Sequence, residues 1–173
     1  MRAAGLLATV GLLLSGVNAH TDVLIRHVTV YDGSGAPPFA ADVRIQGDRI
    51  AAIAPQLEPL SGETVRDQHG LALAPGFIDM HSHGNGGLLE DLDAATVSRQ
   101  GVTTIVVGQD GESDFPLRDW FGKLNATPPA INVASMVGHA TLRLQAMGKD
   151  LYRPSTPQEL AQMKSLLKHE LTA

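Results

Sequence analysis

Two histidines separated by one residue, His81 and His83, directly follow a short apolar segment that opens with Pro75-Gly76. On a β-strand, residues i and i+2 lie on the same face about 6.6 Å apart, so both imidazoles would point to one side. Two converging imidazoles can bind one divalent metal ion. A His-x-His pair equally suits two polar loop residues, so the surrounding elements have to decide between these interpretations.

Three more side chains follow later apolar segments. Asp110 comes after residues 103–107 and is a candidate metal ligand or a partner of one, although Asp-Gly is also a common turn pair and Glu112 or Asp114 could equally be the relevant carboxylate. His139 ends the segment 131–137, where it could contact substrate or cap a strand. Arg143 follows on the same loop and could pair with a substrate carboxylate or remain solvated.

The remaining histidines lie outside any expected strand end, so we interpret them as surface or structural residues: His20, His27, His69 and His169.

Strands and helices alternate in the second part of the chain. Thr156-Pro157-Gln158-Glu159 predicts the start of the last helix, because it combines an N-cap threonine, proline at the first helical position and a capping-box glutamate. Apolar residues then line one helical face: Leu160, Met163, Leu166 and Leu167. The expected strands are residues 76–80, 103–107 and 131–137, and the earlier helices are residues 88–100 and 117–124.

Repeated β-then-α units predict an α/β fold with a parallel sheet, of the kind that builds a TIM-type (β/α)8 barrel. A whole barrel needs about 250 residues. Residues 75–173 supply only the first three of eight units, so we expect a partial barrel with His81 and His83 at the mouth of its first strand. A general acid or base is then expected downstream of Ala173.

Residues 20–74 predict a small β-sandwich-like unit. The β-forming residues Val23, Ile25, Val28 and Val30 precede a turn-rich stretch. A hairpin follows, in which residues 42–46 and 49–53 flank Gly47-Asp48, a two-residue loop suited to a type II′ turn.

Residues 1–19 have the pattern of a signal peptide. Arg2 precedes an apolar stretch, and Val17-Asn18-Ala19 places small residues at a cleavage site, so we expect the mature chain to begin near His20. The stretch is shorter than the roughly 20 residues of a membrane span, which predicts a periplasmic or secreted protein without a stable membrane anchor. The chain has no cysteine and therefore no disulfide.

The charge pattern excludes one class of partner. The net charge is −5, and the 13 lysines and arginines are scattered along the chain, which does not indicate nucleic-acid binding.

Residues 74–83, an apolar strand that ends in His-x-His, resemble the start of the barrel in the metal-dependent amidohydrolase superfamily. Residues 101–108 and 132–143 are similar to the second and third strand regions of one family within it, the D-aminoacylases (N-acyl-D-amino-acid deacylases). The resemblance implies that His81 and His83 bind a divalent metal, with zinc favoured. That family usually has a cysteine ligand where this chain has Asp110, a harder ligand that leaves the ion, and the number of ions, open.

By resemblance, the parent enzyme hydrolyses the amide bond of an N-acyl-D-amino acid, a small-molecule substrate. The metal would activate water and polarise the carbonyl, and a carboxylate would move the proton. This chain alone is expected to be inactive, because five barrel strands are missing. A cyclic amide or dipeptide substrate, and a truncated non-enzymatic remnant that only binds metal, stay open as alternatives.

Overall fold

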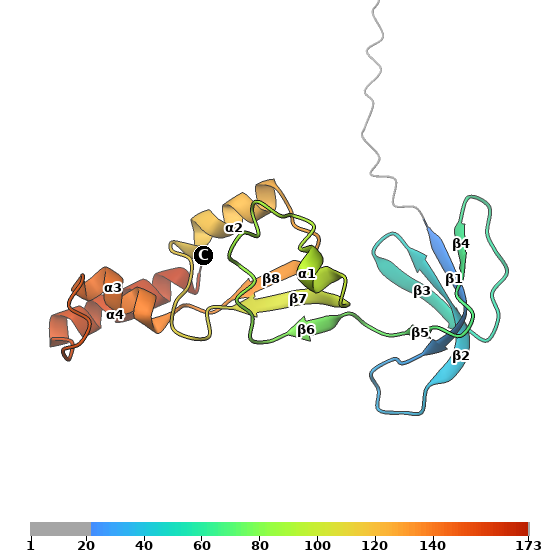
Figure 1. Cartoon of the computed structure of the whole chain (residues 1–173), viewed down its shortest axis with the longest axis horizontal. Coiled ribbons are helices and arrows are strands. Elements are labelled where there is room, and N and C mark those ends of the chain that lie inside the picture. The colour runs from blue at the N-terminus through green and yellow to red at the C-terminus, as the bar shows by residue number, and fades with distance from the viewer. Residues whose placement is uncertain (1–21, 173) are drawn as a thin grey trace, which may run out of the picture. The chain divides into compact units, whose positions relative to one another are not determined.

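The computed structural model describes residues 22–172, and the expected signal peptide and the start near His20 lie outside them. Among the described residues, no helix is long and apolar enough to cross a membrane. The chain divides into two compact units, with the division between Pro75 and Gly76. Strands make up the first unit, and the second combines strands and helices (Figure 1).

Five strands form the first unit: β1 (Val23–Val30), β2 (Phe39–Gln46), β3 (Arg49–Ala54), β4 (Thr64–Asp67) and β5 (Ala72–Leu73). They belong to one sheet in the order β3-β2-β1-β4, and β5 also pairs with β1. The expectation of a sandwich-like unit was wrong in this respect. Instead of forming a second sheet, β4 and β5 both run parallel to β1 along the same edge.

The predicted hairpin is present between β2 and β3, which pair antiparallel. Gly47 has a φ of 59°, whereas Asp48 is not among the residues with positive φ. A positive φ at the first central residue only is the pattern of the predicted type II′ turn.

A β-bulge in β1 changes which residues face the core of the first unit. Ile25 pairs with Val43 and Val28 pairs with Ala41, so β1 has one more residue than β2 between these pairs. Because side chains alternate along a strand, the extra residue moves the apolar positions from odd to even numbers. Ile25 before the bulge therefore shares a core with Val28 and Val30 after it.

The carboxylate of Asp42 supports the bulge from the opposite face of the sheet. Only 1% of Asp42 is exposed, and it accepts hydrogen bonds from the backbone N–H groups of His27 (2.9 Å) and Leu57 (3.0 Å). The Nε of Arg26 lies 3.3 Å from the same carboxylate. Burial alone would raise the pKa of Asp42, but these hydrogen bonds and the Arg26 charge outweigh it and hold the pKa below its ordinary value of 3.8.

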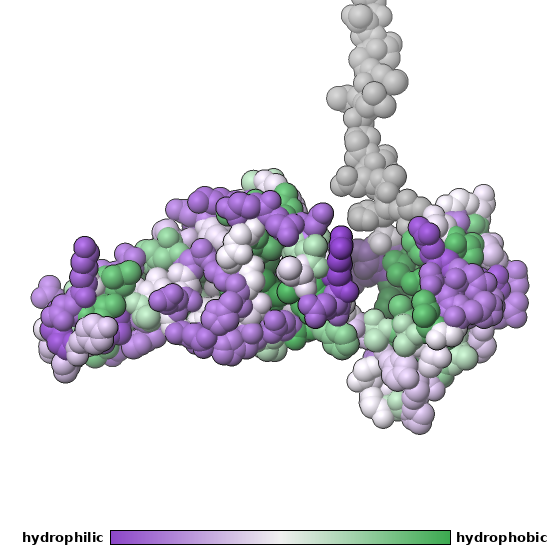
Figure 2. Space-filling model, viewed as in Figure 1, coloured by the Kyte–Doolittle hydropathy of each residue, from purple (hydrophilic) through white to green (hydrophobic). Residues whose placement is uncertain are grey.

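Part of the first unit's surface is apolar. Ile50 and Ile53 of β3 are 67% and 43% exposed, and green hydrophobic surface is visible on this unit in Figure 2. These residues, with Val30, Val43 and Leu73 among others, border an open apolar groove of about 360 Å³.

Three parallel strands form the sheet of the second unit: β6 (Phe77–Asp79), β7 (Val102–Val107) and β8 (Asn132–Ser135), in that order. Helix α1 (Ala95–Ser98) lies between β6 and β7 in the chain, and α2 (Leu117–Ala126) lies between β7 and β8. Helices α3 (His139–Met147) and α4 (Pro157–Glu170) follow and pack side by side (Figure 1). The predicted α/β alternation and all three strand positions are confirmed.

The core of the second unit lies between the middle strand and α2. Ile105 and Val107 of β7 are completely or almost completely buried. Leu117, Trp120 and Leu124 share a core cluster with them. Their spacing of three and four residues puts them on one face of α2, which explains why this helix was predictable.

The helix expected at residues 88–100 is only one turn long. Residues before α1 form successive turns, for example through the bond from the Glu90 N–H to the Gly87 carbonyl. Ala94, directly before α1, has a left-handed φ of 44°, so no regular helix extends across it.

Helix α3 was not predicted. Gly138 and Gly148 flank it, and its buried residues include Leu142 and Met147. His139 was therefore wrongly placed at the end of a strand and Arg143 wrongly placed on a loop. The strand ends at Ser135, and both residues belong to α3.

The capping box predicted for the last helix is confirmed. The Oγ1 of Thr156 accepts a hydrogen bond from the Glu159 N–H, and the Glu159 carboxylate accepts one from the Thr156 N–H. The predicted apolar face is only partly buried, because Met163 is 6% exposed whereas Leu160 is 44% exposed.

The end of α4 is joined to the start of α2. Glu170 is 3% exposed, and its carboxylate accepts a hydrogen bond of 2.7 Å from the N–H of Leu117. Pro116, the residue before α2, provides no side-chain cap. Glu170 therefore satisfies a helix N-terminus that local residues leave open.

We predict that Asp42→Ala lowers the free energy of unfolding by about 3 kcal/mol, because it leaves buried N–H donors without an acceptor. Since the pKa of Asp42 is lower in the folded state, its ionised form stabilises the fold above pH 3.8, and this contribution is lost as the pH falls below that value. Urea unfolding from pH 7 to pH 3 measures both effects.

Asp48→Ala is the matched control, because the Asp48 side chain is 80% exposed. It should change the free energy of unfolding by less than about 0.5 kcal/mol. Equal stability of the Asp42→Ala and Asp48→Ala variants at pH 7 would contradict the role given to Asp42.

Candidate metal centre

The carboxyl ends of β6 and β7 lie at the same edge of the sheet, because the two strands are parallel. The Ser82 N–H donates to the Val106 carbonyl at 2.9 Å, which continues the strand pairing beyond β6. The Gln109 Nε2 donates to the carbonyls of Met80 (2.6 Å) and Val106 (2.7 Å). Hydrogen bonds thus connect the segment that follows β6, which carries His81 and His83, to the segment that follows β7, which carries Asp110.

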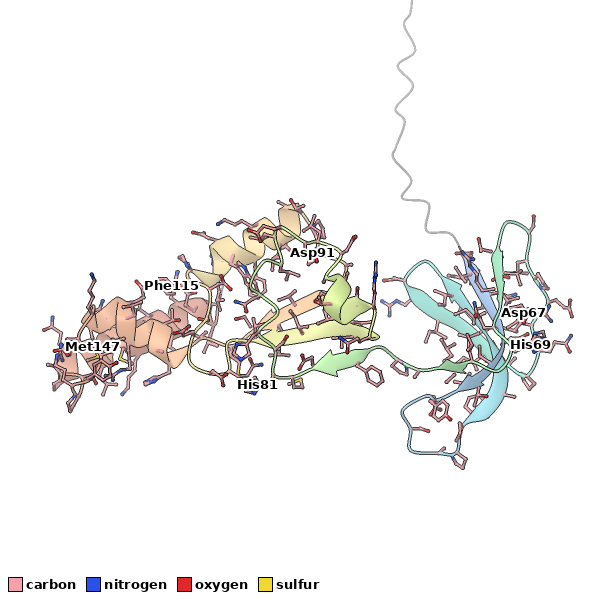
Figure 3. All side chains as sticks on the ribbon, in the orientation of Figure 1. Asp67, His69, His81, Asp91, Phe115 and Met147 are labelled. Atoms are coloured by element: carbon pink, nitrogen blue, oxygen red, sulfur yellow. The ribbon has the colours of Figure 1, made fainter. Side chains whose placement is uncertain are left out.

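All three predicted ligand residues come together here. The Nε2 of His81 lies 3.1 Å from Oδ1 of Asp110, and the Nε2 of His83 lies 3.0 Å from Oδ2. The two imidazole centroids are 5.7 Å apart. Figure 3 shows His81 where the chain leaves β6, and Ser82, between the two histidines, is buried. Of the carboxylates considered, Asp110 is therefore the one beside the histidines.

Asp110 is kept ionised by its neighbours. The hydrogen bond with His81, followed by the charge of His81 and by the hydrogen bond and charge of His83, holds the pKa of Asp110 below its ordinary value, although partial desolvation acts in the opposite direction. The ionised carboxylate is the form of Asp110 that can bind a cation.

The donor set fits a divalent transition metal. Each residue offers one ligand atom, and these three atoms lie within 4.8 Å of one another. Two ligands about 2.1 Å from a tetrahedral zinc are about 3.4 Å apart, close to the observed nitrogen–oxygen distances. The three side chains are 57%, 76% and 58% exposed, so they can adjust to an ion and exchange it with solvent.

An acidic hollow of about 450 Å³ has His83 and Asp110 among its lining residues. Glu112 and Asp114 line it together with Asp110, and no lysine or arginine is among the lining residues. The Nδ2 of Asn85 donates to Asp114 at 3.0 Å, which holds one of these carboxylates in place. The hollow therefore attracts cations and repels a free carboxylate.

Glycines set the position of the Asp110 loop. Gly108 has a φ of 87°, and a Cβ built on it would lie 2.7 Å from the carbonyl oxygen of Met136. A Cβ on Gly138 would overlap the backbone of residues 111–113. Both positions require glycine because the backbones of two neighbouring loops are in close approach.

Hydrogen bonds tie the same loop to the start of α3. The Ser113 N–H donates to Oγ1 of Thr141 at 2.9 Å, and the Gly138 N–H donates to Oγ of Ser113 at 3.0 Å. Sequence reasoning did not single out Ser113, Thr141 or the two glycines. The sequence signal that could have indicated them is the glycine that follows each apolar strand, Gly108 and Gly138.

The structure also locates the two predicted substrate contacts. His139 is the exposed first residue of α3. The guanidinium of Arg143 donates to the carbonyls of Leu151 (2.7 Å) and Arg153 (2.9 Å). A substrate carboxylate would have to displace these bonds, and the substrate roles of both residues stay predictions.

Curated relatives cover most of this chain. A D-aminoacylase of Alcaligenes xylosoxydans xylosoxydans is 38% identical across 88% of the chain, and an N-acyl-D-aspartate deacylase of the same organism is 37% identical across 92%. The chain spans 36% of the length of each of these relatives. No family model matches the sequence.

Solved structures of deacylases are also similar to this chain. The N-acyl-D-glutamate deacylase of Bordetella bronchiseptica, complexed with zinc and a phosphonate inhibitor that mimics the tetrahedral intermediate, superimposes with a TM-score of 0.78 at 35% identity. A D-aminoacylase with a binuclear metal centre gives 0.79 at 37% identity. Both alignments cover 88% of this chain and 36% of the other.

We predict that Gly108→Ala separates Asp110 from the histidines and lowers the free energy of unfolding by at least about 2 kcal/mol, because the new methyl group meets a backbone oxygen and the left-handed φ is strained. Urea unfolding measures the stability, and NMR of the His81 and His83 imidazoles measures the displacement.

Gly122→Ala is the control, because Gly122 lies within α2 and a Cβ there meets nothing within 4 Å. It should raise the free energy of unfolding by about 0.5 to 1 kcal/mol and leave the imidazole resonances unchanged. Unchanged resonances in Gly108→Ala as well would rule out the positioning role of Gly108.

Proposed function

We propose that this chain, a homologue of the D-aminoacylases of the amidohydrolase superfamily, supplies part of the metal centre of an enzyme that hydrolyses N-acyl-D-amino acids. The observation that carries the proposal is the convergence of His81, His83 and Asp110 at the carboxyl ends of β6 and β7. Functional groups of parallel α/β enzymes collect at this end of the strands. The names of the similar proteins supply the substrate class.

The proposed architecture is the beginning of a (β/α)8 barrel. Three parallel strands in the order β6-β7-β8, each followed in the chain by a helix, are what the first three units of such a barrel require. The similarity to solved deacylase structures supports this proposal. His81 and His83 would then stand at the mouth of the first barrel strand.

His81, His83 and Asp110 would hold a divalent ion, with zinc as our first choice because imidazole nitrogens dominate the donor set. When bound, such an ion lowers the pKa of water toward neutrality and polarises the substrate carbonyl. Asp110 contributes a full negative charge, and the Gln109 bonds to Met80 and Val106 hold the two ligand-bearing segments together.

The acidic hollow restricts how an N-acyl amino acid can bind. Its Asp110, Glu112 and Asp114 side chains would repel the substrate's own carboxylate. The amide end of the substrate would therefore approach the histidines, and its carboxylate would be bound by basic groups outside this hollow.

Export to the periplasm or medium remains part of the proposal. It rests on the pattern of residues 1–19.

We predict that Zn²⁺ added to the purified chain shifts the imidazole resonances of His81 and His83. Replacing either histidine by asparagine should weaken this binding by about tenfold or more, because one ligand of three is lost. Asp110→Cys should instead tighten zinc binding, since thiolate is a softer ligand than carboxylate. NMR titration with zinc measures each affinity at the residues concerned.

His169→Asn serves as the control, because His169 is exposed on α4 and far from these residues in the chain. It should bind zinc at His81 and His83 as the unchanged chain does. A titration that moves neither imidazole at millimolar zinc would exclude the metal centre.

The substrate class is tested in a hybrid enzyme in which residues 22–172 replace the matching segment of a D-aminoacylase. We predict that the hybrid releases acetate from N-acetyl-D-amino acids, and that the His81→Asn/His83→Asn hybrid loses at least about 100-fold of kcat/KM, because the ion is no longer held. Equal activity of the two hybrids would refute the role of the histidines. Faster hydrolysis of a cyclic amide or a dipeptide would refute the substrate assignment and leave the metal centre intact.

A further inference from the structure

The first unit contains a second group of metal-ligating side chains: His27, Asp67 and His69. The Nδ1 of His27 lies 2.9 Å from Oδ1 of Asp67, and the Nε2 of His69 lies 3.4 Å from the same oxygen. The two imidazoles stack with their centroids 4.1 Å apart and their planes 9° from parallel. The three potential ligand atoms lie within 4.8 Å of one another, as in the His81 group.

The β1 bulge presents His27. His27 has a left-handed φ of 58°, which is uncommon for a residue other than glycine. Its N–H donates to the buried carboxylate of Asp42, so the backbone is fixed in this conformation. The direction of the Cα–Cβ bond of His27 is therefore fixed by the bulge.

The turn between β4 and β5 presents the other two residues opposite the bulge. Asp67 is the last residue of β4 and pairs with Arg26 of β1. The Gln68 N–H donates to the Arg26 carbonyl at 3.0 Å, and the Thr29 N–H donates to the Leu71 carbonyl at 2.9 Å. Backbone hydrogen bonds on both sides of the group thus hold bulge and turn together, and Figure 3 shows Asp67 and His69 next to each other on this turn.

The chemistry of the group suits a transition metal. Two imidazoles and one carboxylate are ligands that Zn²⁺, Ni²⁺ and Cu²⁺ accept.

Access and local charge agree with this chemistry. The guanidinium of Arg26, a positive charge near this group, lies 3.3 Å from the buried carboxylate of Asp42, which offsets part of its repulsion of a cation. The His27, Asp67 and His69 side chains are 38%, 52% and 75% exposed, so an ion can enter from solution.

We propose that His27, Asp67 and His69 bind a divalent transition-metal ion at a site separate from the His81 site, with water completing its coordination. The ion joins the bulge of β1 to the turn that follows β4, and thereby links residues 40 positions apart in the sequence. Because it binds the folded unit and not the unfolded chain, it raises the thermal stability of the first unit. This site does not depend on the proposed enzymatic function.

Equilibrium dialysis against ZnCl₂ tests the proposal with the purified chain and three variants. The first variant replaces His27 and His69 by asparagine, which tolerates the left-handed backbone at position 27 better than alanine does. The second replaces His81 and His83 by asparagine, and the third is His169→Asn, a matched exposed histidine. We expect two zinc ions per unchanged chain and per His169→Asn chain, and one per chain for each double variant.

The second double variant gives an independent measurement, because it retains only the His27 site. Zinc should shift its His27 and His69 imidazole resonances and raise its Tm, and EDTA should reverse both effects. Circular dichroism in EDTA checks that each variant is folded.

If the His27→Asn/His69→Asn chain binds as much zinc as the unchanged chain, and zinc leaves the His27 and His69 resonances in place, the group is only a hydrogen-bonded link and the proposal is wrong. If zinc binds at His27 and His69 but not at His81 and His83, the second site stands and the proposed metal centre fails. The two proposals are thereby tested separately.

Discussion

The parallel pairing of β6 with β7 is the constraint on which the candidate metal centre depends. Parallel strands end at the same edge of a sheet, so residues about 30 positions apart in the chain leave that edge side by side. Gln109 strengthens the arrangement by donating to a carbonyl on each of the two segments. Asp110 is the next residue, and its carboxylate therefore reaches both histidines without a long loop to order.

The metal centre also depends on backbone contacts behind it. Gly108 and Gly138 allow the Asp110 loop to approach the chain between β8 and α3, and Ser113 and Thr141 add hydrogen bonds. These residues are not themselves candidate ligands, yet their contacts fix the loop that carries the carboxylate. In the first unit, Asp42 acts similarly on the bulge that carries His27, so both histidine groups rest on backbone that other side chains hold in place.

The sequence predicted the features that depend on neighbouring residues in the chain. The capping box at Thr156, the turn at Gly47 and the spacing of His81 and His83 depend on residues only a few positions apart, and the structure contains each feature. Helix α3 was missed because residues 131–143 were interpreted as one strand and its following loop. His27 and His69 are exposed, as expected, but the link between bulge and turn was not predicted, because residues 40 positions apart give no local signal.

The bond between Glu170 and Leu117 has a consequence for the order of events during synthesis. Helix α2 has a suitable apolar face when it leaves the ribosome, but its first N–H finds its buried acceptor only 53 residues later. At about 5 to 20 residues per second, this interval lasts about 3 to 10 s. During that time the N-terminus of α2 is open to water or to a chaperone, because this buried contact cannot form before the last turn of α4 has been made.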